Sequence, residues 1–184
     1  MKEIFIQIIG GHAVGKSATA SWLKNEYKEN VCLLGKYKIS KTTPNVSTGG
    51  LDAEKLTNQQ RFELIEKSWF NDSKIVIAEG MIISYWGSFL SKYKKLQEKK
   101  ERRVLIIHLF SDIEKVKERV YKRSNGKELN TKRLENLIGK LSSAKSSFRK
   151  CKLFSSYELM EFDTTEEKSF DIVKEELKKK IEGG

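Results

Sequence analysis

The segment from residue 10 to residue 17 has the residue types of a loop that holds phosphate groups. It reads Gly10, Gly11, His12, Ala13, Val14, Gly15, Lys16 and Ser17, matching G-x-x-x-x-G-K-[ST] in full. Glycines let the backbone curl so that successive N–H groups point at one anion, and a helix N-terminus adds partial positive charge. The pattern therefore predicts that these residues and Ala18 bind ATP, with Lys16 at the β- and γ-phosphates and Ser17 on Mg²⁺.

A second candidate ligand for Mg²⁺ is a carboxylate at the end of a predicted strand. Glu79 follows the apolar run 75–78 and precedes Gly80. In a doubly wound sheet the carboxyl ends of neighbouring strands border the ligand cleft. Glu79 could hold Mg²⁺ through water or accept the proton of an acceptor hydroxyl. The alternative is a glutamate stabilised by a helix N-terminus.

Two arginines could neutralise charge during phosphoryl transfer. Arg119 and Arg123 lie one turn apart on a predicted helix, so they share one side of it. The segment 118–127 resembles the lid of small kinases, and the resemblance implies that these arginines contact the transferring phosphoryl group. The alternative is a solvated basic helix. Arg133 and Arg149 are weaker candidates, provided that the helix 131–149 folds back toward the nucleotide.

Strand-length and helix-length patterns alternate along the chain, as in βαβ units. Strands are predicted at 4–9, 31–34, 74–78, 104–110 and 159–162, and helices at 18–28, 56–70, 82–100, 112–124, 131–149 and 166–181. Residues 36–50, with Pro44 and a glycine pair, are expected to form a loop. The pattern predicts an α/β fold with a five-stranded parallel sheet flanked by helices, as one domain spanning 1–184 with a small lid at about 112–130.

Aromatic residues and histidines in these segments admit two interpretations. Tyr85, Trp86 and Phe89 could stack on a nucleobase, but at helical spacing such residues are more often core. His108 lies in an apolar run and is expected at the core or at the edge of a cleft. His12 is expected to act in the phosphate loop chiefly through its backbone.

The charge and composition of the chain limit the classes of protein to which it can belong. The chain has 36 Lys and Arg against 25 Asp and Glu, and residues 92–150 hold 19 against 7. This excess is either a solvated helical surface or a face for polyphosphate or nucleic acid. The two cysteines, Cys32 and Cys151, are too few for a disulfide framework or a zinc site. The apolar runs are too short for a membrane helix, and without a signal-peptide pattern we expect a cytoplasmic protein.

The motifs that accompany the phosphate loop favour a kinase. The strings N-K-x-D and D-x-x-G of GTPase switches are absent from the sequence, and the chain is short for a helicase or motor. The layout resembles the nucleotide and nucleoside kinase superfamily. In finer detail, Gly35-Lys36-Tyr37, Gly49-Gly50-Leu51-Asp52 and Ala78-Glu79-Gly80 resemble phage-type P-loop (deoxy)nucleotide kinases, a group that includes 5-hydroxymethyluracil DNA kinases.

This resemblance implies roles for the carboxylates and for the acceptor. Asp52 would lie in the acceptor pocket as general base while Glu79 serves Mg²⁺, or the two would exchange roles; a plain helix N-cap is the alternative for Asp52. The expected activity is transfer of the γ-phosphoryl of ATP to the 5-hydroxymethyl group of hydroxymethyluracil in DNA. Two alternatives stay open: a free deoxynucleoside monophosphate kinase and a non-catalytic, ATP-gated DNA-binding module. The localised basic excess favours DNA, because a free-nucleotide kinase needs only a few phosphate-binding cations.

Overall fold

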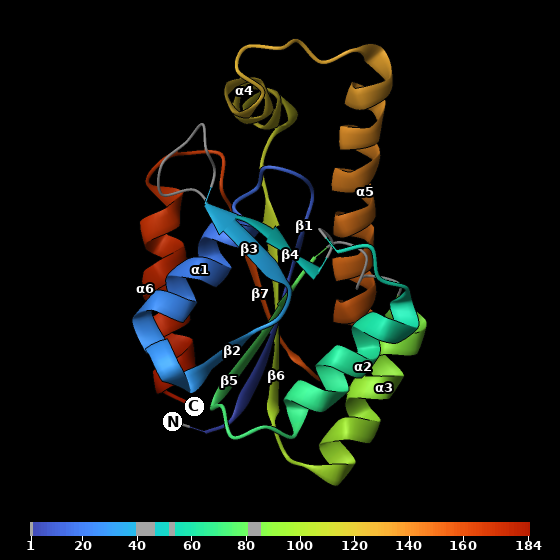
Figure 1. The fold of residues 1–184 in the computed structure, drawn as a ribbon, viewed down its shortest axis with the longest axis vertical. Coiled ribbons are helices and arrows are strands. Elements are labelled where there is room, and N and C mark those ends of the chain that lie inside the picture. The colour runs from blue at the N-terminus through green and yellow to red at the C-terminus, as the bar shows by residue number, and fades with distance from the viewer. Residues whose placement is uncertain (1, 40–46, 52–53, 81–85) are drawn as a thin grey trace.

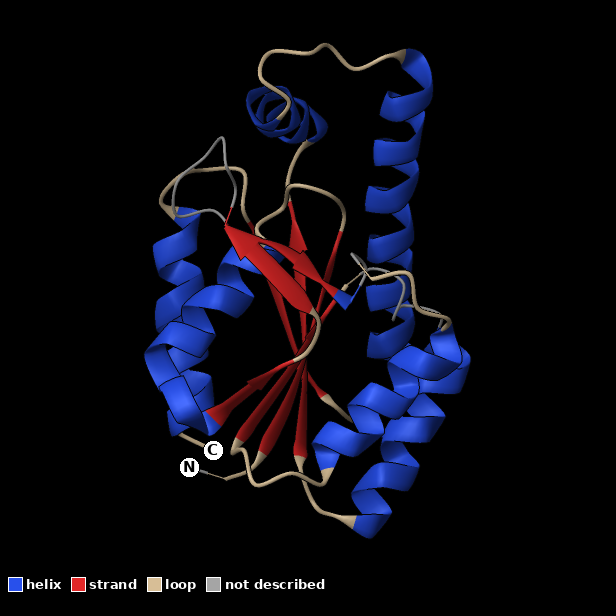
Figure 2. Ribbon diagram, viewed as in Figure 1, coloured by secondary structure: helices blue, strands red, loops and turns tan. Residues whose placement is uncertain are grey.

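Mainly apolar runs form the three central strands of the sheet. The computed structural model describes residues 2–39, 47–51, 54–80 and 86–184. Strands β1 (Ile4–Gly10), β5 (Ile75–Glu79) and β6 (Arg103–Phe110) are buried on both faces, which suits their β-branched composition. Strands β2 (Val31–Leu33) and β7 (Glu158–Asp163) complete a parallel sheet in the order β2-β5-β1-β6-β7 (Figures 1 and 2). The predicted five-stranded parallel sheet is confirmed.

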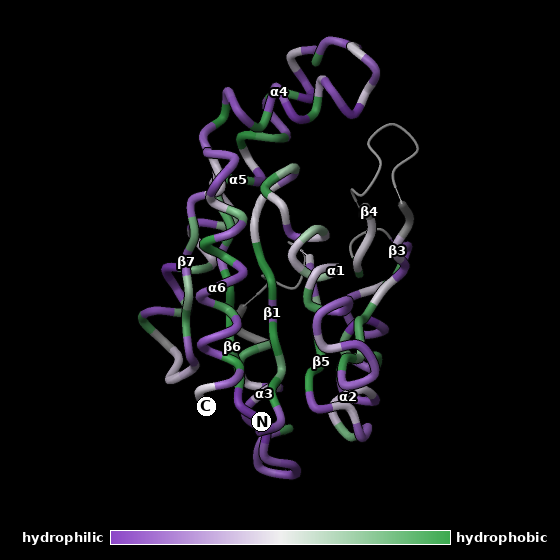
Figure 3. Tube along the Cα trace, turned by 90° about the vertical axis from the view of Figure 1, so that its left-hand side faces the viewer, coloured by the Kyte–Doolittle hydropathy of each residue, from purple (hydrophilic) through white to green (hydrophobic). Residues whose placement is uncertain are grey.

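Helices cover both faces of this sheet. Helices α1 (Lys16–Tyr27) and α6 (Ser169–Glu182) pack on one face, and a short 3₁₀ turn (Lys28–Asn30) follows α1. Helices α2 (Asn58–Trp69), α3 (Trp86–Lys99) and α5 (Thr131–Phe154) pack on the other. Helix α4 (Ile113–Arg123) lies beyond the carboxyl end of the sheet and consists largely of hydrophilic residues (Figure 3).

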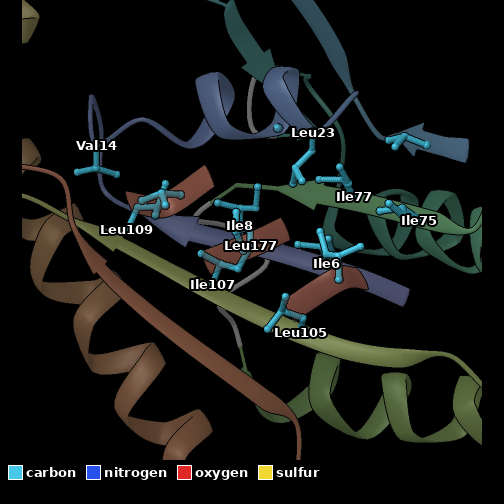
Figure 4. Close-up of a cluster of buried hydrophobic side chains, with 14 of the residues drawn as sticks. Ile6, Ile8, Val14, Leu23, Ile75, Ile77, Leu105, Ile107, Leu109 and Leu177 are labelled. Carbon is cyan, nitrogen blue, oxygen red and sulfur yellow. The ribbon is translucent and has the colours of Figure 1, made fainter. Parts of the chain in front are cut away.

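Alternation along the strands separates two hydrophobic cores. Ile6 and Ile8 of β1 face α1 and α6, where Leu23 and Leu177 meet them (Figure 4). Phe5 and Ile9 point the opposite way, into the core formed with α2, α3 and α5. The strands are thus fixed from both sides, which holds their carboxyl ends in a defined register.

The segment 36–50 is not a simple loop, and here the sequence-based expectation was wrong. Strands β3 (Lys36–Ile39) and β4 (Ser47–Gly50) pair antiparallel, with Lys36 opposite Gly50. Glycines were interpreted as loop signals, but they permit close backbone approach: a Cβ on Gly35 would lie 2.4 Å from the carbonyl carbon of Gly50. Residues 40–46, including Pro44, lie outside the described residues.

Phe89 belongs to the core and not to a base-stacking surface. It is 2% exposed and packs edge-on against Phe62 and Tyr93. Tyr85 lies outside the described residues, as does the side chain of Trp86. His108 is also buried, as expected, and its Nδ1 lies 2.9 Å from Glu161 Oε1. Within the described part of the chain, none of the helices has the length and apolar content needed to span a membrane.

Arg102 is a structural residue, although the sequence analysis counted it in the basic excess. Its side chain is fully buried and donates hydrogen bonds to the carbonyl oxygens of Trp69, Asn71 and Ser73 at 2.7–2.9 Å. It also pairs with Glu3 at 3.1 Å. This guanidinium joins the end of α2 to the start of the sheet, at the edge opposite the phosphate loop.

Replacing Arg102 with methionine should destabilise the fold by about 3 kcal/mol, because buried carbonyls and a carboxylate lose their donor. Urea unfolding followed by circular dichroism measures this change. Lys95→Met is the matched control: Lys95 is exposed on α3, and its replacement should change the free energy of unfolding by no more than about 0.5 kcal/mol. Equal effects of the two variants would contradict the structural role of Arg102.

Candidate functional site

The phosphate loop joins the end of β1 to the start of α1. Ala13 (φ 58°) and Gly15 (φ 95°) adopt left-handed conformations that turn the backbone into a compact loop. Position 10 has room only for glycine, because a Cβ there would lie 2.4 Å from the carbonyl oxygen of Leu109. No described side chain caps the N-terminus of α1. Its first N–H groups therefore face the loop, where an anion can accept from them.

Lys16 is folded over this loop. Its Nζ donates to the carbonyl oxygen of Gly11 at 2.6 Å. The other side of the loop touches α5: a Cβ on Gly11 would lie 2.5 Å from Leu141 Cδ2. Helix α5 thus folds back to the nucleotide loop, as expected for the helix that carries Arg133. The Lys16 ammonium lies where it can meet phosphate oxygens held by the loop.

Ser17 and Glu79 meet at the mouth of the loop. The Ser17 hydroxyl donates to Glu79 Oε1 at 2.8 Å, and Glu79 is 1% exposed. Hydroxyl and carboxylate oxygens are the hard ligands that Mg²⁺ prefers, and this cation commonly enters with nucleotide phosphates. The pair therefore fits a magnesium ion bound together with a triphosphate. Among the described residues, there is no group of three His, Cys, Asp or Glu that could hold a metal without such help.

Gly50 fixes the position of the Glu79 carboxylate. A Cβ on Gly50 would lie 2.2 Å from Glu79 Oε1, and the backbone of Gly50 is left-handed (φ 94°). Strand β4 is thus packed directly on the carboxylate, at the same oxygen that accepts from Ser17. Only glycine leaves room for both groups, which gives the glycine pair noted in the sequence a physical role.

Gly50→Ala should displace the Glu79 carboxylate from Ser17. We expect phosphoryl transfer to fall at least about tenfold and the Mg²⁺ concentration for half-maximal activity to rise, as for lost ligand support. A magnesium titration of the steady-state rate measures both. Gly139→Ala is the control, because Gly139 lies on α5 with no atom within 4 Å of the added methyl group. An unchanged magnesium dependence in Gly50→Ala would show that β4 does not position Glu79.

Arg119 is bonded to the backbone around the loop. Its Nη1 donates to the carbonyl oxygen of Ala13 at 3.2 Å, and its Nη2 donates to that of Thr164. The Thr164 hydroxyl in turn lies 3.0 Å from the carbonyl oxygen of Val14. In this state Arg119 joins the phosphate loop to the β7–α6 connection, so it can position the loop. Contact with a transferring phosphoryl group stays a prediction.

A cationic cavity opens beside the loop, between α4 and α5. It has a volume of about 290 Å³, and its described lining contains no carboxylate. It is lined by His12, Ala13, Val120, Arg123, Leu129, Arg133, Asn136, Leu137 and Lys140. Lys140 Nζ lies 2.5 Å from His12 Nε2. Partial desolvation and repulsion from Arg119 lower the pKa of Arg123, although it stays protonated. An anion in this cavity would relieve that repulsion.

Asp52 itself lies outside the described residues, but its flanks are anchored. The side chain of Arg61 is buried and donates to the carbonyl oxygens of Leu51 at 3.4 Å and Glu54 at 3.2 Å. Arg61 lies on α2, whose N-terminus is closed by a capping box formed by Thr57 and Gln60. A buried arginine therefore ties both sides of Asp52 to a rigid helix.

Sequence reasoning missed Thr164, Lys140 and Arg61. Thr164 follows β7 directly, so its place at the carboxyl end of a strand was a usable signal. Lys140 and Arg61 gave no such signal, because their spacing only placed them on helices. Their contacts depend on how α5 and α2 pack.

The comparisons with known proteins identify the fold. Neither a protein-family model nor a curated protein matches the chain. Among solved structures, the YorR protein from Bacillus subtilis, in complex with phosphorylated GDP, aligns over 94% of this chain and 93% of its own. The TM-score is 0.55 at 17% identity. A gluconokinase from Sinorhizobium meliloti 1021 aligns over 94% of this chain and 88% of its own, with a TM-score of 0.50 at 14% identity. The chain thus has the α/β fold of P-loop kinases, with the sheet order and phosphate loop described above.

Proposed function

We propose that this protein is an ATP-dependent phosphotransferase that acts on a hydroxyl group of a nucleic-acid building block. One observation carries the proposal: the Ser17 hydroxyl and the Glu79 carboxylate meet 2.8 Å apart at the mouth of a complete phosphate loop. This pair fits a cation on the nucleotide phosphates, which would neutralise the charge that develops in phosphoryl transfer. The YorR complex with a phosphorylated nucleotide supports a nucleotide as the ligand class.

Different residues of the chain would perform different parts of phosphoryl transfer. The loop amides and Lys16 hold the β- and γ-phosphates, and Ser17 with Glu79 would hold Mg²⁺, which neutralises charge on the phosphate oxygens. Arg123, Arg133 and Lys140 supply positive charge from the adjoining cavity. Catalysis on this scheme is positioning and charge neutralisation, with little covalent chemistry left to the protein.

The acceptor that we propose is the 5-hydroxymethyl group of hydroxymethyluracil in DNA. Its oxygen attacks the γ-phosphorus, the bond from that phosphorus to the β,γ-bridging oxygen breaks, and ADP leaves with the bond's electron pair. The hydroxyl proton passes to a carboxylate, for which Asp52 and Glu79 are the two candidates. The motif resemblance supports this acceptor.

Incubation with γ-labelled ATP and Mg²⁺ tests the proposal against its alternatives. The acceptors are hydroxymethyluracil-containing DNA, DNA of the same sequence with thymine, and free deoxynucleoside monophosphates. We expect label in the first DNA alone. Label in the free nucleotides would replace this acceptor with that of a deoxynucleoside monophosphate kinase. Binding of ATP with transfer to none of them would point to the ATP-gated DNA-binding module.

A further inference from the structure

The positive charges of residues 92–150 do not form one face. Lys99, Lys100 and Arg103 pair with acidic side chains at 2.8–3.8 Å. They lie near the amino-terminal edge of the sheet, where Arg103 begins β6, whereas the phosphate loop lies at the carboxyl edge (Figure 1). These three cations are engaged in ion pairs within the protein, so a surface for a polyanion must lie on other residues.

Helix α5 carries a polar stripe that begins at the phosphate loop. Every third or fourth position is polar, which places these residues along one side of the helix. The stripe consists of Arg133, Asn136, Lys140, Ser143, Ser147 and Lys150. Its first three members line the cavity beside His12. No ion pair of Arg133 or Lys150 occurs within 4.0 Å in the described ranges of the chain, and both residues are exposed.

The opposite flank of α5 faces a different environment. Lys152 pairs with Glu161 of β7 at 3.2 Å. Burial lowers the pKa of His108 on β6, and the charges of Lys145 and Lys152 act in the same direction, so both lysines lie near that strand. The flank with Lys145 and Lys152 thus faces the β6–β7 edge of the sheet. Arg133, Asn136 and Lys140 lie on another side of the helix, at the cavity beside the phosphate loop.

The length of the stripe identifies a polymer as its partner. From Lys140 to Lys150 the helix rises about 15 Å, and from Arg133 to Lys150 about 25 Å. Phosphates follow one another at about 3.4 Å along the axis of one strand of duplex DNA, so 15 Å corresponds to about four nucleotides. A single nucleotide held beside Lys140 does not extend to Lys150. Only an acceptor with several phosphates can use both ends of the stripe.

We propose that a nucleic-acid strand lies along α5, with its phosphates on Arg133, Lys140 and Lys150, and enters the phosphate-loop site at the Lys140 end. This inference rests on the proposed function, since it assigns the surface that presents a DNA acceptor to the site. The cations bind the phosphates, and Ser143, which is exposed, lies between Lys140 and Lys150 along the helix, whereas Ser147 is buried and takes no part. Lys150 distinguishes the two kinds of site, because a strand with several phosphates extends to it and a single nucleotide held beside Lys140 does not.

The test is the salt dependence of DNA binding by the full chain, measured by fluorescence anisotropy without ATP. Lys150→Gln should reduce the slope of log affinity against log salt by about 0.9 with duplex DNA, or about 0.7 with a single strand. Lys95→Gln is the matched control: Lys95 is also exposed but lies on α3, outside the proposed surface, and its replacement should leave the slope unchanged. ATP affinity should be the same in both variants and the wild type.

Two results would overturn the α5 surface. One is a flat salt profile for the wild type, and the other is an equal slope in Lys150→Gln and Lys95→Gln. Failure of the proposed function is seen separately, as absence of label in hydroxymethyluracil-containing DNA. A slope that falls only in Lys150→Gln supports the surface whether or not label is transferred.

Discussion

Lys16→Ala should lower phosphoryl transfer at least about a hundredfold and leave the fold intact. The Lys16 ammonium is held over the phosphate loop by its bond to the Gly11 carbonyl, so its loss removes one positive charge from the place where phosphate charge develops. The side chain is only partly buried, and little packing depends on it. Steady-state transfer of label from ATP gives the rate, and thermal unfolding gives the stability.

Lys94→Ala serves as the control for Lys16→Ala, because Lys94 is an exposed lysine on α3. It should retain the wild-type rate. A folded Lys16→Ala protein with most of its activity would show that the loop between residues 10 and 17 does not hold the transferred phosphate.

Glu79→Gln should also lower transfer by at least about a hundredfold, the lower range for a group that takes part in proton transfer or holds a catalytic metal. Glutamine keeps the shape of the side chain and can still accept from Ser17, but it loses the negative charge that favours Mg²⁺. The Mg²⁺ concentration for half-maximal activity should rise as well. Metal titrations at fixed ATP separate this effect from a change in the chemical step.

Asp52→Asn completes the comparison of the two carboxylates. If Asp52 is the base, its replacement should lower the rate as strongly as Glu79→Gln while leaving the magnesium titration unchanged. Near-normal turnover in Glu79→Gln would reduce Glu79 to a structural partner of Ser17. Near-normal turnover in Asp52→Asn would leave that residue as a helix cap.

The features that local sequence determines were predicted well. The strands 4–9, 74–78 and 104–110 are mainly apolar runs, typical of a sheet covered on both faces, and the structure has them at β1, β5 and β6. The phosphate loop was equally clear, because its glycines and Lys16 belong to one short segment. The meeting of Ser17 with Glu79 followed from strand order, since β1 and β5 are neighbours.

Contacts between segments that are distant in the sequence could not be predicted from local patterns. The Arg119 guanidinium contacts carbonyls 106 and 45 residues away, and Lys140 contacts His12 from 128 residues away. Helical spacing placed Arg119 on one side of its helix with Arg123 but could not show which backbone it would meet. The hairpin β3–β4 was missed because glycines that allow close approach look the same in a sequence as glycines of a loop.

Net charge was the least reliable guide, because a sequence does not distinguish a paired cation from an unpaired one. Arg102 is fully buried against carbonyl oxygens, whereas Lys150 is exposed on α5. Both counted equally in the basic excess. The packing shows that Arg102 supports the fold and that Lys150 is exposed to solvent.

The most direct test of the central claim uses two labelled forms of ATP with hydroxymethyluracil-containing DNA. If the protein transfers the γ-phosphoryl group, label from γ-labelled ATP should enter the DNA and label from α-labelled ATP should not. Digestion to nucleosides should then locate the phosphate on the 5-hydroxymethyl group of the modified base. Absence of γ-label from the DNA with active, Mg²⁺-supplied protein would contradict the proposed activity, as would incorporation of the α-label.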